Sequence, residues 1–167
     1  MNFRSQFAER AQQLRQVGAD VPKTLRAVQT AATVAAVRVA QDKTPPNAEN
    51  GISGTGTRTG NLKAHWASDS NIWSEQHGNE YTTTLANNMY YASYVNDGHD
   101  MSQHFVPGLM VNPKSGMLER VPPNIGGIVV GTKTSRVPGV YMNEAAIEEY
   151  KQVVIEQLDK ALDALKK

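Results

Sequence analysis

The stretch that decides the fold reads Asn87-Asn88-Met89-Tyr90-Tyr91-Ala92-Ser93-Tyr94-Val95-Asn96-Asp97-Gly98-His99. Its three tyrosines are expected to form a corner in which the rings lie in the core and the hydroxyls bond to backbone groups. Gly98 suits a position that needs an unusual backbone angle. Tyrosines also stack on bases in single-strand binders, but no lysine or arginine lies between Lys63 and Lys114 to accompany them. The stretch therefore predicts a structural corner.

Before this corner, apolar residues recur every three or four positions, which indicates helices. They stand at Phe3, Phe7, Ala11, Leu14, Val17, Val21, Leu25, Val28, Ala32, Ala35 and Val39. Gly18 and Pro22 interrupt the pattern, because glycine commonly ends a helix and proline is tolerated in a first turn. The sequence thus predicts helices over about 3–41, a short one near 3–17 and a longer one near 21–41.

The segment between these helices and the corner divides into a loop and a hairpin. Residues 44–61 begin with Thr44-Pro45-Pro46 and continue polar and glycine-rich, so we expect a flexible loop. Leu62, Ala64 and Trp66 alternate with their neighbours, which favours a half-buried strand that continues to residue 72 or 73. The residues His77-Gly78-Asn79 are typical of a turn, and a second run of residues with high β-propensity follows them. A β-hairpin is therefore predicted over about 62–87.

After the corner, segment 99–138 contains five of the eight prolines and little periodicity. It is predicted to be an extended loop, in which the run 127–131 is a candidate for one further strand. Helical periodicity returns over about 141–166, where Asn143 is a candidate N-cap. Its stripe of Ile147, Tyr150, Val154 and Leu158 is expected to pack against the sheet.

This order of elements predicts an α+β fold in a single domain, 1–167. Long N- and C-terminal helices would cover a small antiparallel sheet, with a long inserted loop. Seventeen basic and 16 acidic residues give a net charge of +1, which disfavours a strongly basic nucleic-acid binder. The sequence contains no cysteine, which excludes disulfides and thiolate sites and fits a reducing cytoplasm. No apolar run approaches the roughly 20 residues that span a bilayer, so we expect a soluble protein.

The residue types that carry chemistry do not form a recognisable site in the sequence. His99 and His104 are five positions apart, a spacing that does not place them on one helix face as a helical metal site requires. The segment Gly51 to Gly60 lacks the Gly-Lys-Ser/Thr ending of a phosphate-binding loop and is interpreted as a linker. Arg58 and Lys63 are candidate contacts to a phosphate or to an acidic neighbouring subunit. No Gly-x-Ser-x-Gly elbow occurs. The sequence therefore predicts no catalytic residue, metal or cofactor.

Three patches of the sequence together resemble the tail-completion, or head-to-tail joining, family of long-tailed bacteriophages. They are Thr59-Gly60-Asn61-Leu62-Lys63, the Tyr91-Ala92-x-x-Val95-x-x-Gly98-His99 pattern, and Gly139-Val140-Tyr141-Met142-Asn143-Glu144-Ala145. The chain departs from the family at Asn96-Asp97, and its segment between His99 and Gly139 is longer than usual.

The resemblance implies a non-enzymatic virion protein of the phage neck, assembled in the host cytoplasm as a ring, expected to be six-fold. The ring would join the tail tube to the head connector, with head connector or stopper proteins and tail tube or tail terminator proteins as partners. The genome would pass through it without sequence-specific binding. Alternatives are a tail-terminator or other neck ring protein, or a small non-enzymatic cytoplasmic binding module.

The resemblance also implies roles for two groups of residues. The candidate fold-corner residues are Tyr90, Tyr91, Ala92, Val95, Gly98 and His99. Inserted loops in such rings often make partner-specific contacts, so the long segment 99–138 is the candidate contact region. Its candidate partner-contact residues are His104, Phe105, Met110, Met117, Leu118 and Arg120.

Overall fold

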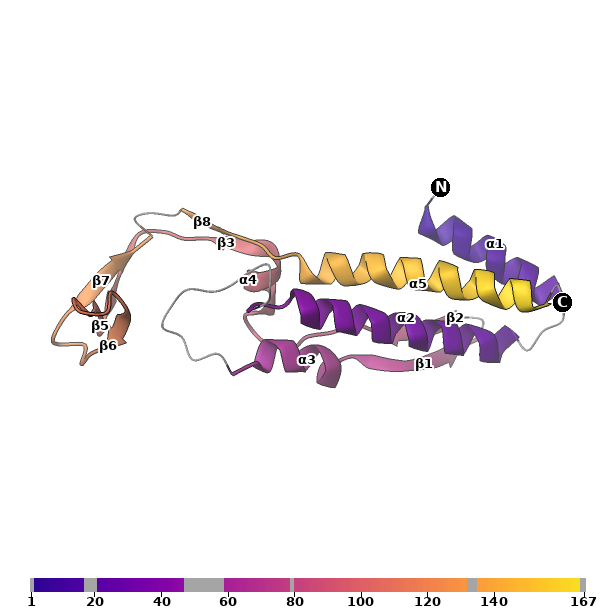
Figure 1. Cartoon of the computed structure of the whole chain (residues 1–167), viewed down its shortest axis with the longest axis horizontal. Helices are drawn as coiled ribbons and strands as arrows, with labels where there is room; N and C mark the ends of the chain where they lie inside the picture. The colour runs from indigo at the N-terminus through magenta and orange to yellow at the C-terminus, as the bar shows by residue number, and fades with distance from the viewer. Residues whose placement is uncertain (1, 17–20, 47–58, 79, 132–134, 166–167) are drawn as a thin grey trace.

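The computed structural model describes residues 2–16, 21–46, 59–78, 80–131 and 135–165 (Figure 1). The helices are α1 (Phe3–Gln16), α2 (Val21–Lys43), α3 (Asn61–Asp69), α4 (Ala92–Asp97) and α5 (Met142–Leu165). The strands are β1 (Asn71–His77), β2 (Glu80–Thr84), β3 (Gly98–Asp100), β4 (His104–Pro107), β5 (Leu109–Val111), β6 (Leu118–Arg120), β7 (Gly127–Val130) and β8 (Arg136–Pro138). The predicted α+β class, with long helices near both ends of the chain, is confirmed.

The molecule consists of an elongated body and an arm (Figure 1). In the body, α2 and α5 run side by side, α1 lies against α5, and α3 and the antiparallel β1–β2 hairpin lie beside α2. The arm, residues 98–138, leaves the body at the N-terminal end of α5. Its stem is the β3–β8 pair, followed by the β4–β7 and β5–β6 pairs, all antiparallel. The described strands therefore form four separate two-stranded sheets and not one sheet.

Two clusters of buried side chains form the core of the body. One joins Leu14 of α1 to Leu25 and Val28 of α2 and to Val154 and Leu158 of α5. The other lies at the end of the body nearest the arm, where α2, α3 and the start of α5 meet. The α5 stripe was expected to pack against the sheet, but Val154 and Leu158 pack mainly with residues of α1 and α2, while Tyr81 of β2 also packs against this cluster.

The segment 61–69 was expected to begin the hairpin but forms helix α3. Leu62 and Trp66 are its buried residues, and a spacing of four places both on one helix face. Ala64, the middle residue of the apparent alternation, is exposed. The Trp66 indole N–H donates to the Thr44 hydroxyl over 2.9 Å, which fixes α3 on the end of α2. The hairpin itself is shorter than predicted and comprises β1 and β2.

The segment 99–138 was expected to be an extended loop, and this expectation is also wrong. Six short strands, β3 to β8, occupy much of it, and the run predicted as one further strand is β7. Single-sequence periodicity does not reveal these strands because each has only three or four residues. Most of the flexible loop expected over 44–61 lies outside the described residues. None of the described helices is long and apolar enough to cross a membrane.

Candidate functional site

The three sequence patches converge at the end of the body from which the arm leaves. Leu62 of α3, Tyr91 and Val95 at α4, and Met142 of α5 belong to or pack against one apolar cluster with the C-terminal half of α2. The Asn87 side-chain amide donates to the Leu62 carbonyl over 2.8 Å and connects the first patch to the segment that leads into the second. Residues of all three patches contribute to this apolar cluster and help to bury one another. This shared burial gives a structural reason why the three patches occur together in one sequence.

Asn96 joins α4 to the start of α5. Its side-chain oxygen accepts a hydrogen bond of 2.8 Å from the backbone N–H of Asn143, and its amide donates to Glu144 and to Asp97. Its backbone carbonyl accepts from the Tyr141 N–H over 2.9 Å. A helix N-terminus leaves backbone N–H groups without partners, so Asn96 serves as a cap supplied from a distant part of the chain. The prediction of Asn143 as N-cap is wrong, because Asn143 lies inside α5.

Replacing Asn96 with alanine is expected to reduce the free energy of unfolding by about 1–2 kcal/mol, the usual cost of losing an N-cap. The measurement is denaturant unfolding followed by circular dichroism. Asn143→Ala is the matched control, because this exposed position should change stability by no more than about 0.5 kcal/mol. A larger loss in the Asn143 variant than in the Asn96 variant would contradict the assignment of the cap.

The tyrosines of the corner do not all lie in the core as expected. Tyr91 is half-buried and packs against the apolar cluster, whereas Tyr90 is 86% exposed and Tyr94 58% exposed. The Tyr94 ring meets the His99 ring edge-on with the ring centroids 5.7 Å apart. The Nδ1 atom of His99 is buried, and no described residue bonds to it. Tyr90 and Tyr94 therefore present aromatic surface beside the root of the arm.

Gly98 and Gly139 allow the stem of the arm to pass close to α4. Gly98 has the unusual backbone angle expected of it, with φ 74° and ψ 178°. A Cβ atom added there would lie 2.3 Å from the Val137 carbonyl oxygen, and one added at Gly139 would lie 2.4 Å from the Asn96 carbonyl oxygen. Neither position has room for a side chain. The pairing of β3 with β8 therefore depends on both glycines.

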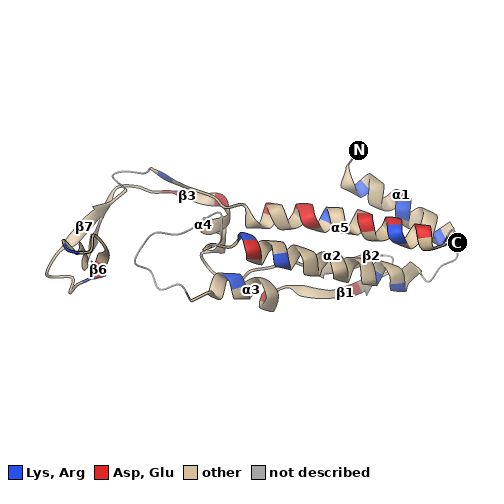
Figure 2. Ribbon diagram, viewed as in Figure 1, with Lys and Arg blue, Asp and Glu red and all other residues tan. Residues whose placement is uncertain are grey.

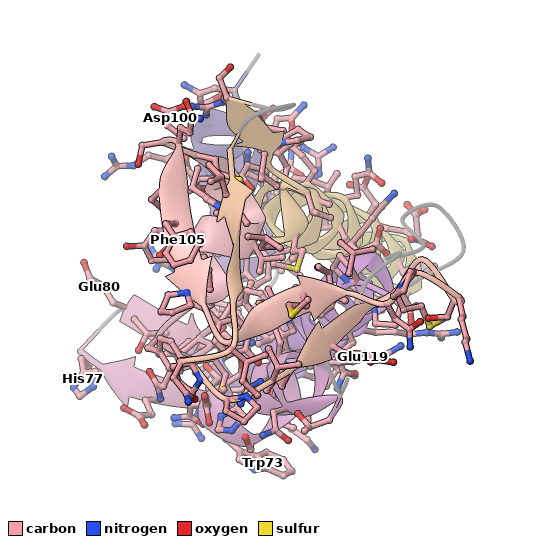
Figure 3. The ribbon with its side chains drawn as sticks, turned by 90° about the vertical axis from the view of Figure 1, so that its left-hand side faces the viewer. Trp73, His77, Glu80, Asp100, Phe105 and Glu119 are labelled. Carbon is pink, nitrogen blue, oxygen red and sulfur yellow. The ribbon has the colours of Figure 1, made fainter. Side chains whose placement is uncertain are left out.

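The arm contains almost no buried residue. Among its described residues, Gly108 alone is buried. Six large apolar side chains are exposed, namely Phe105, Met110, Val111, Met117, Ile125 and Val129. Figure 3 views the molecule from the arm end and shows Phe105 on the arm. Of the other predicted partner-contact residues, His104 and Arg120 are exposed and Leu118 is half-buried.

The remaining candidate contacts are the two basic residues Arg58 and Lys63. Lys63, on α3, has its amino group 3.9 Å from an Asp42 carboxylate oxygen in a half-exposed ion pair. Such pairs contribute little stability. Arg58 lies outside the described residues. Lys63 therefore lies in the body, on α3, and not on the arm.

The side chain of Asp69, the last residue of α3, bonds to the backbone of the segment that precedes α4. Its carboxylate accepts the backbone N–H of Asn88 over 2.7 Å and contacts His65 over 2.8 Å. These hydrogen bonds, with that of Asn88 the largest influence, lower the pKa of Asp69 below its ordinary value. A carboxyl group whose pKa is lower in the folded chain stabilises the fold above its ordinary pKa. This stabilisation disappears as the pH falls through the lowered value.

Asp69→Asn is therefore expected to flatten the dependence of stability on pH over the acidic range below about pH 5. The wild-type melting temperature should fall more steeply over this range than that of the variant. Glu80→Gln is the matched control, because it removes one exposed carboxylate that makes no such contacts. Parallel curves for the wild type and the Asp69 variant would show that Asp69 has no such role.

The described part of the chain contains no metal-binding cluster of acidic and histidine side chains. No group of three or more histidine, aspartate or glutamate side chains is placed to hold a metal ion there. His104 instead contacts the Ser102 carbonyl through Nδ1 over 2.8 Å. A hollow of about 320 Å³ lies between α2, α5 and β2, and we call it the α2/α5/β2 hollow. It is lined by Thr33, Ala36, Tyr81, Thr82, Thr83, Leu85, Ala146, Ile147 and Tyr150.

This hollow lacks the groups that acid–base catalysis needs at neutral pH. Its lining contains no carboxylate, histidine or lysine. Burial raises the pKa of Tyr150 further above the neutral range, so this hydroxyl does not ionise readily. The arrangement is suited to receiving an apolar group.

Comparison with known proteins identifies the family. Residues 5–98 match the family model HK97-gp10_like, described as "Bacteriophage HK97-gp10, putative tail-component". Comparisons with curated proteins and with solved structures gave no match. The matched residues extend from α1 to Gly98 at the root of the arm. Because they include more than half of the 167 residues, the chain belongs to the HK97-gp10-like family of bacteriophage tail components.

Proposed function

We propose that this tail component is a structural protein of the phage neck, where it forms a ring that joins the tail tube to the head connector. The observation that carries the proposal is the arm, which exposes six large apolar side chains and buries almost none. Several large apolar side chains exposed within one small region of a protein favour a contact with another protein. Together with membership of a tail-component family, this surface supports an assembly role without catalysis.

The proposed partners fall into two groups. Copies of the same chain would form the ring, which we expect to be six-fold. Head connector or stopper proteins would contact one side of the ring, and tail tube or tail terminator proteins the other. The net charge of +1 favours passage of the genome through the ring without sequence-specific binding. The ring would assemble in the host cytoplasm before becoming part of the virion.

Loss of the protein is expected to leave phages with filled heads and complete tails that do not join. Electron microscopy of lysates tests this directly, with the wild-type chain supplied in trans as the rescue control. Tails of abnormal length would instead indicate a tail terminator. Infectious, fully joined particles from the deletion would exclude the joining role.

A second variant tests whether the arm is the contact surface. Residues 101–135 are replaced by an Asn-Gly turn between Asp100 and Arg136, which face each other across the β3–β8 pair. The body should fold, as judged by circular dichroism, but rescue of joining should be lost. Arg38→Ala, on the exposed face of α2, is the control and should rescue fully. Normal joining by the shortened chain would show that the arm is not needed.

A further inference from the structure

The arm presents a cross-strand apolar pair on the β4–β7 ribbon. Phe105 and Val129 face each other in the register of this ribbon, and they are 59% and 48% exposed. A Cβ atom added to Gly127 would lie 2.3 Å from the Phe105 ring, so the ring rests against the backbone at this glycine. The glycine supports the ring while the rest of it remains open to solvent. An exposed aromatic side chain that is supported on one side in this way can serve as an anchor that fills a pocket on a partner.

The body offers a pocket of matching character. The α2/α5/β2 hollow is lined by uncharged side chains, among them Ala36, Leu85, Ala146 and Tyr150. Ile147, at its α5 wall, is 40% exposed although it is a large apolar residue. The volume of the hollow, about 320 Å³, suffices to hold an aromatic side chain. The hollow and the arm therefore leave complementary apolar surfaces uncovered in the same chain.

One chain cannot bring its own two surfaces together in this conformation. The arm runs away from the body beyond the N-terminal end of α5, whereas the hollow lies alongside the helices of the body (Figure 1). The β3–β8 stem separates the β4–β7 ribbon from that end of the body. A second copy of the chain has no such restriction.

The charges of the two regions are also complementary. The arm has four basic residues and two acidic ones over 98–138, a net charge of +2 with histidine neutral. Helix α5 has six acidic residues and two basic ones, a net charge of −4. Figure 2 shows acidic residues repeated along α5 and few charges on the arm. Opposite net charges favour the approach of the arm of one copy to α5 of another.

We propose that Phe105 and Val129 of one copy dock into the α2/α5/β2 hollow of a second copy. The proposal rests on the proposed function, because it specifies how neighbouring subunits of the ring bind each other. The two surfaces differ, so the contact is head-to-tail, and contacts of this kind close into a ring when the rotation between subunits permits. Each copy then offers one arm and receives one.

Disulfide trapping tests the docking directly, because the natural chain contains no cysteine. A chain carrying Val129→Cys is mixed with a chain carrying Ile147→Cys, both as purified protein and within assembled particles, under mild oxidation. A disulfide requires the two Cα atoms within about 7 Å, so a covalent dimer reports close approach. Val129→Cys mixed with Arg38→Cys is the matched control, because Arg38 is exposed on α2 and does not line the hollow.

The expected result is a 129–147 link and no 129–38 link. Adding Phe105→Ala to the first chain should weaken association about tenfold, the effect of removing an aromatic anchor, whereas Ile125→Ala should not. Absence of the 129–147 link from both purified protein and particles overturns the docking, as does equal linking at position 38. If joining in particles still needs Phe105 when no link forms, the arm binds a different neck protein. In that case the joining function stands and this docking is wrong.

Discussion

Val154→Asp is expected to destabilise the helical body by about 4 kcal/mol or more, because it places an unpaired charge in the core. Val154 is fully buried among Leu14, Val28 and Leu158, and no basic side chain belongs to this cluster. Domains of this size have a total stability of only about 5–15 kcal/mol. The melting temperature should therefore fall by roughly 10 °C or more, and much of the variant should be unfolded when expressed.

Ile147→Asp is the matched control, because Ile147 belongs to the same predicted stripe but is 40% exposed. Its carboxylate can remain hydrated, so we expect a loss of no more than about 1 kcal/mol. Thermal unfolding of the two variants side by side measures the difference. Equal losses, or an unchanged melting temperature for Val154→Asp, would contradict the packing of α5 against α1 and α2.

Sequence periodicity predicted the long helices because their buried residues recur within one continuous segment. The prediction of α1, α2 and α5 required only the spacing of residues such as Leu14, Leu25 and Val154. It failed to identify which part of the chain each helix packs against. Ile147 and Val154 both fit the stripe, but only contacts made by other elements decide that one is exposed and the other buried.

Helix α3 illustrates why a short apolar pattern is ambiguous. Leu62, Ala64 and Trp66 satisfy the period of a strand, while Leu62 and Trp66 alone satisfy that of a helix. Tertiary contacts decide the outcome. The Trp66 indole reaches Thr44 at the end of α2, and its ring joins the apolar cluster with Met142. Neither partner is close in sequence.

The corner and the arm were predicted in part, since their structure depends on distant pairs. Gly98 was singled out correctly for its backbone angle. The cap at the N-terminus of α5 was not predicted, because Asn96 and Asn143 are 47 positions apart. The sequence rules for N-caps consider only residues next to the start of the helix. The exposure of Tyr90 was missed because aromatic content suggests burial but does not reveal which rings are covered by distant parts of the chain. Segment 99–138 was correctly distinguished from the core, although its strands were not predicted.

Gly98→Ala is expected to cost about 3 kcal/mol or more and to disrupt the root of the arm. Gly98 has φ 74° and ψ 178°, a region that is essentially restricted to glycine. An added Cβ would also lie 2.3 Å from the Val137 carbonyl oxygen and 2.6 Å from the Gly139 nitrogen. Because these are backbone atoms, β8 must move, and the β3–β8 pairing should be lost. Hydrogen exchange should show reduced protection in β3 and β8 while the centre of α2 remains protected.

Gly60→Ala is the comparison variant, because Gly60 also has a positive φ but is surrounded by open space. Gly60 has the same φ of 74°, but an added Cβ would meet no atom within 4 Å, so the variant should lose only about 1–2 kcal/mol. The excess loss in Gly98→Ala then reports the close approach of β8 together with the strain of the ψ of 178° at Gly98, which Gly60, with ψ 2°, does not share. It should be accompanied by failure to join heads to tails, because the arm would no longer be held in its position relative to the body. If both alanine variants lose the same stability and both support joining, the close packing of the stem at Gly98 has no role in positioning the arm.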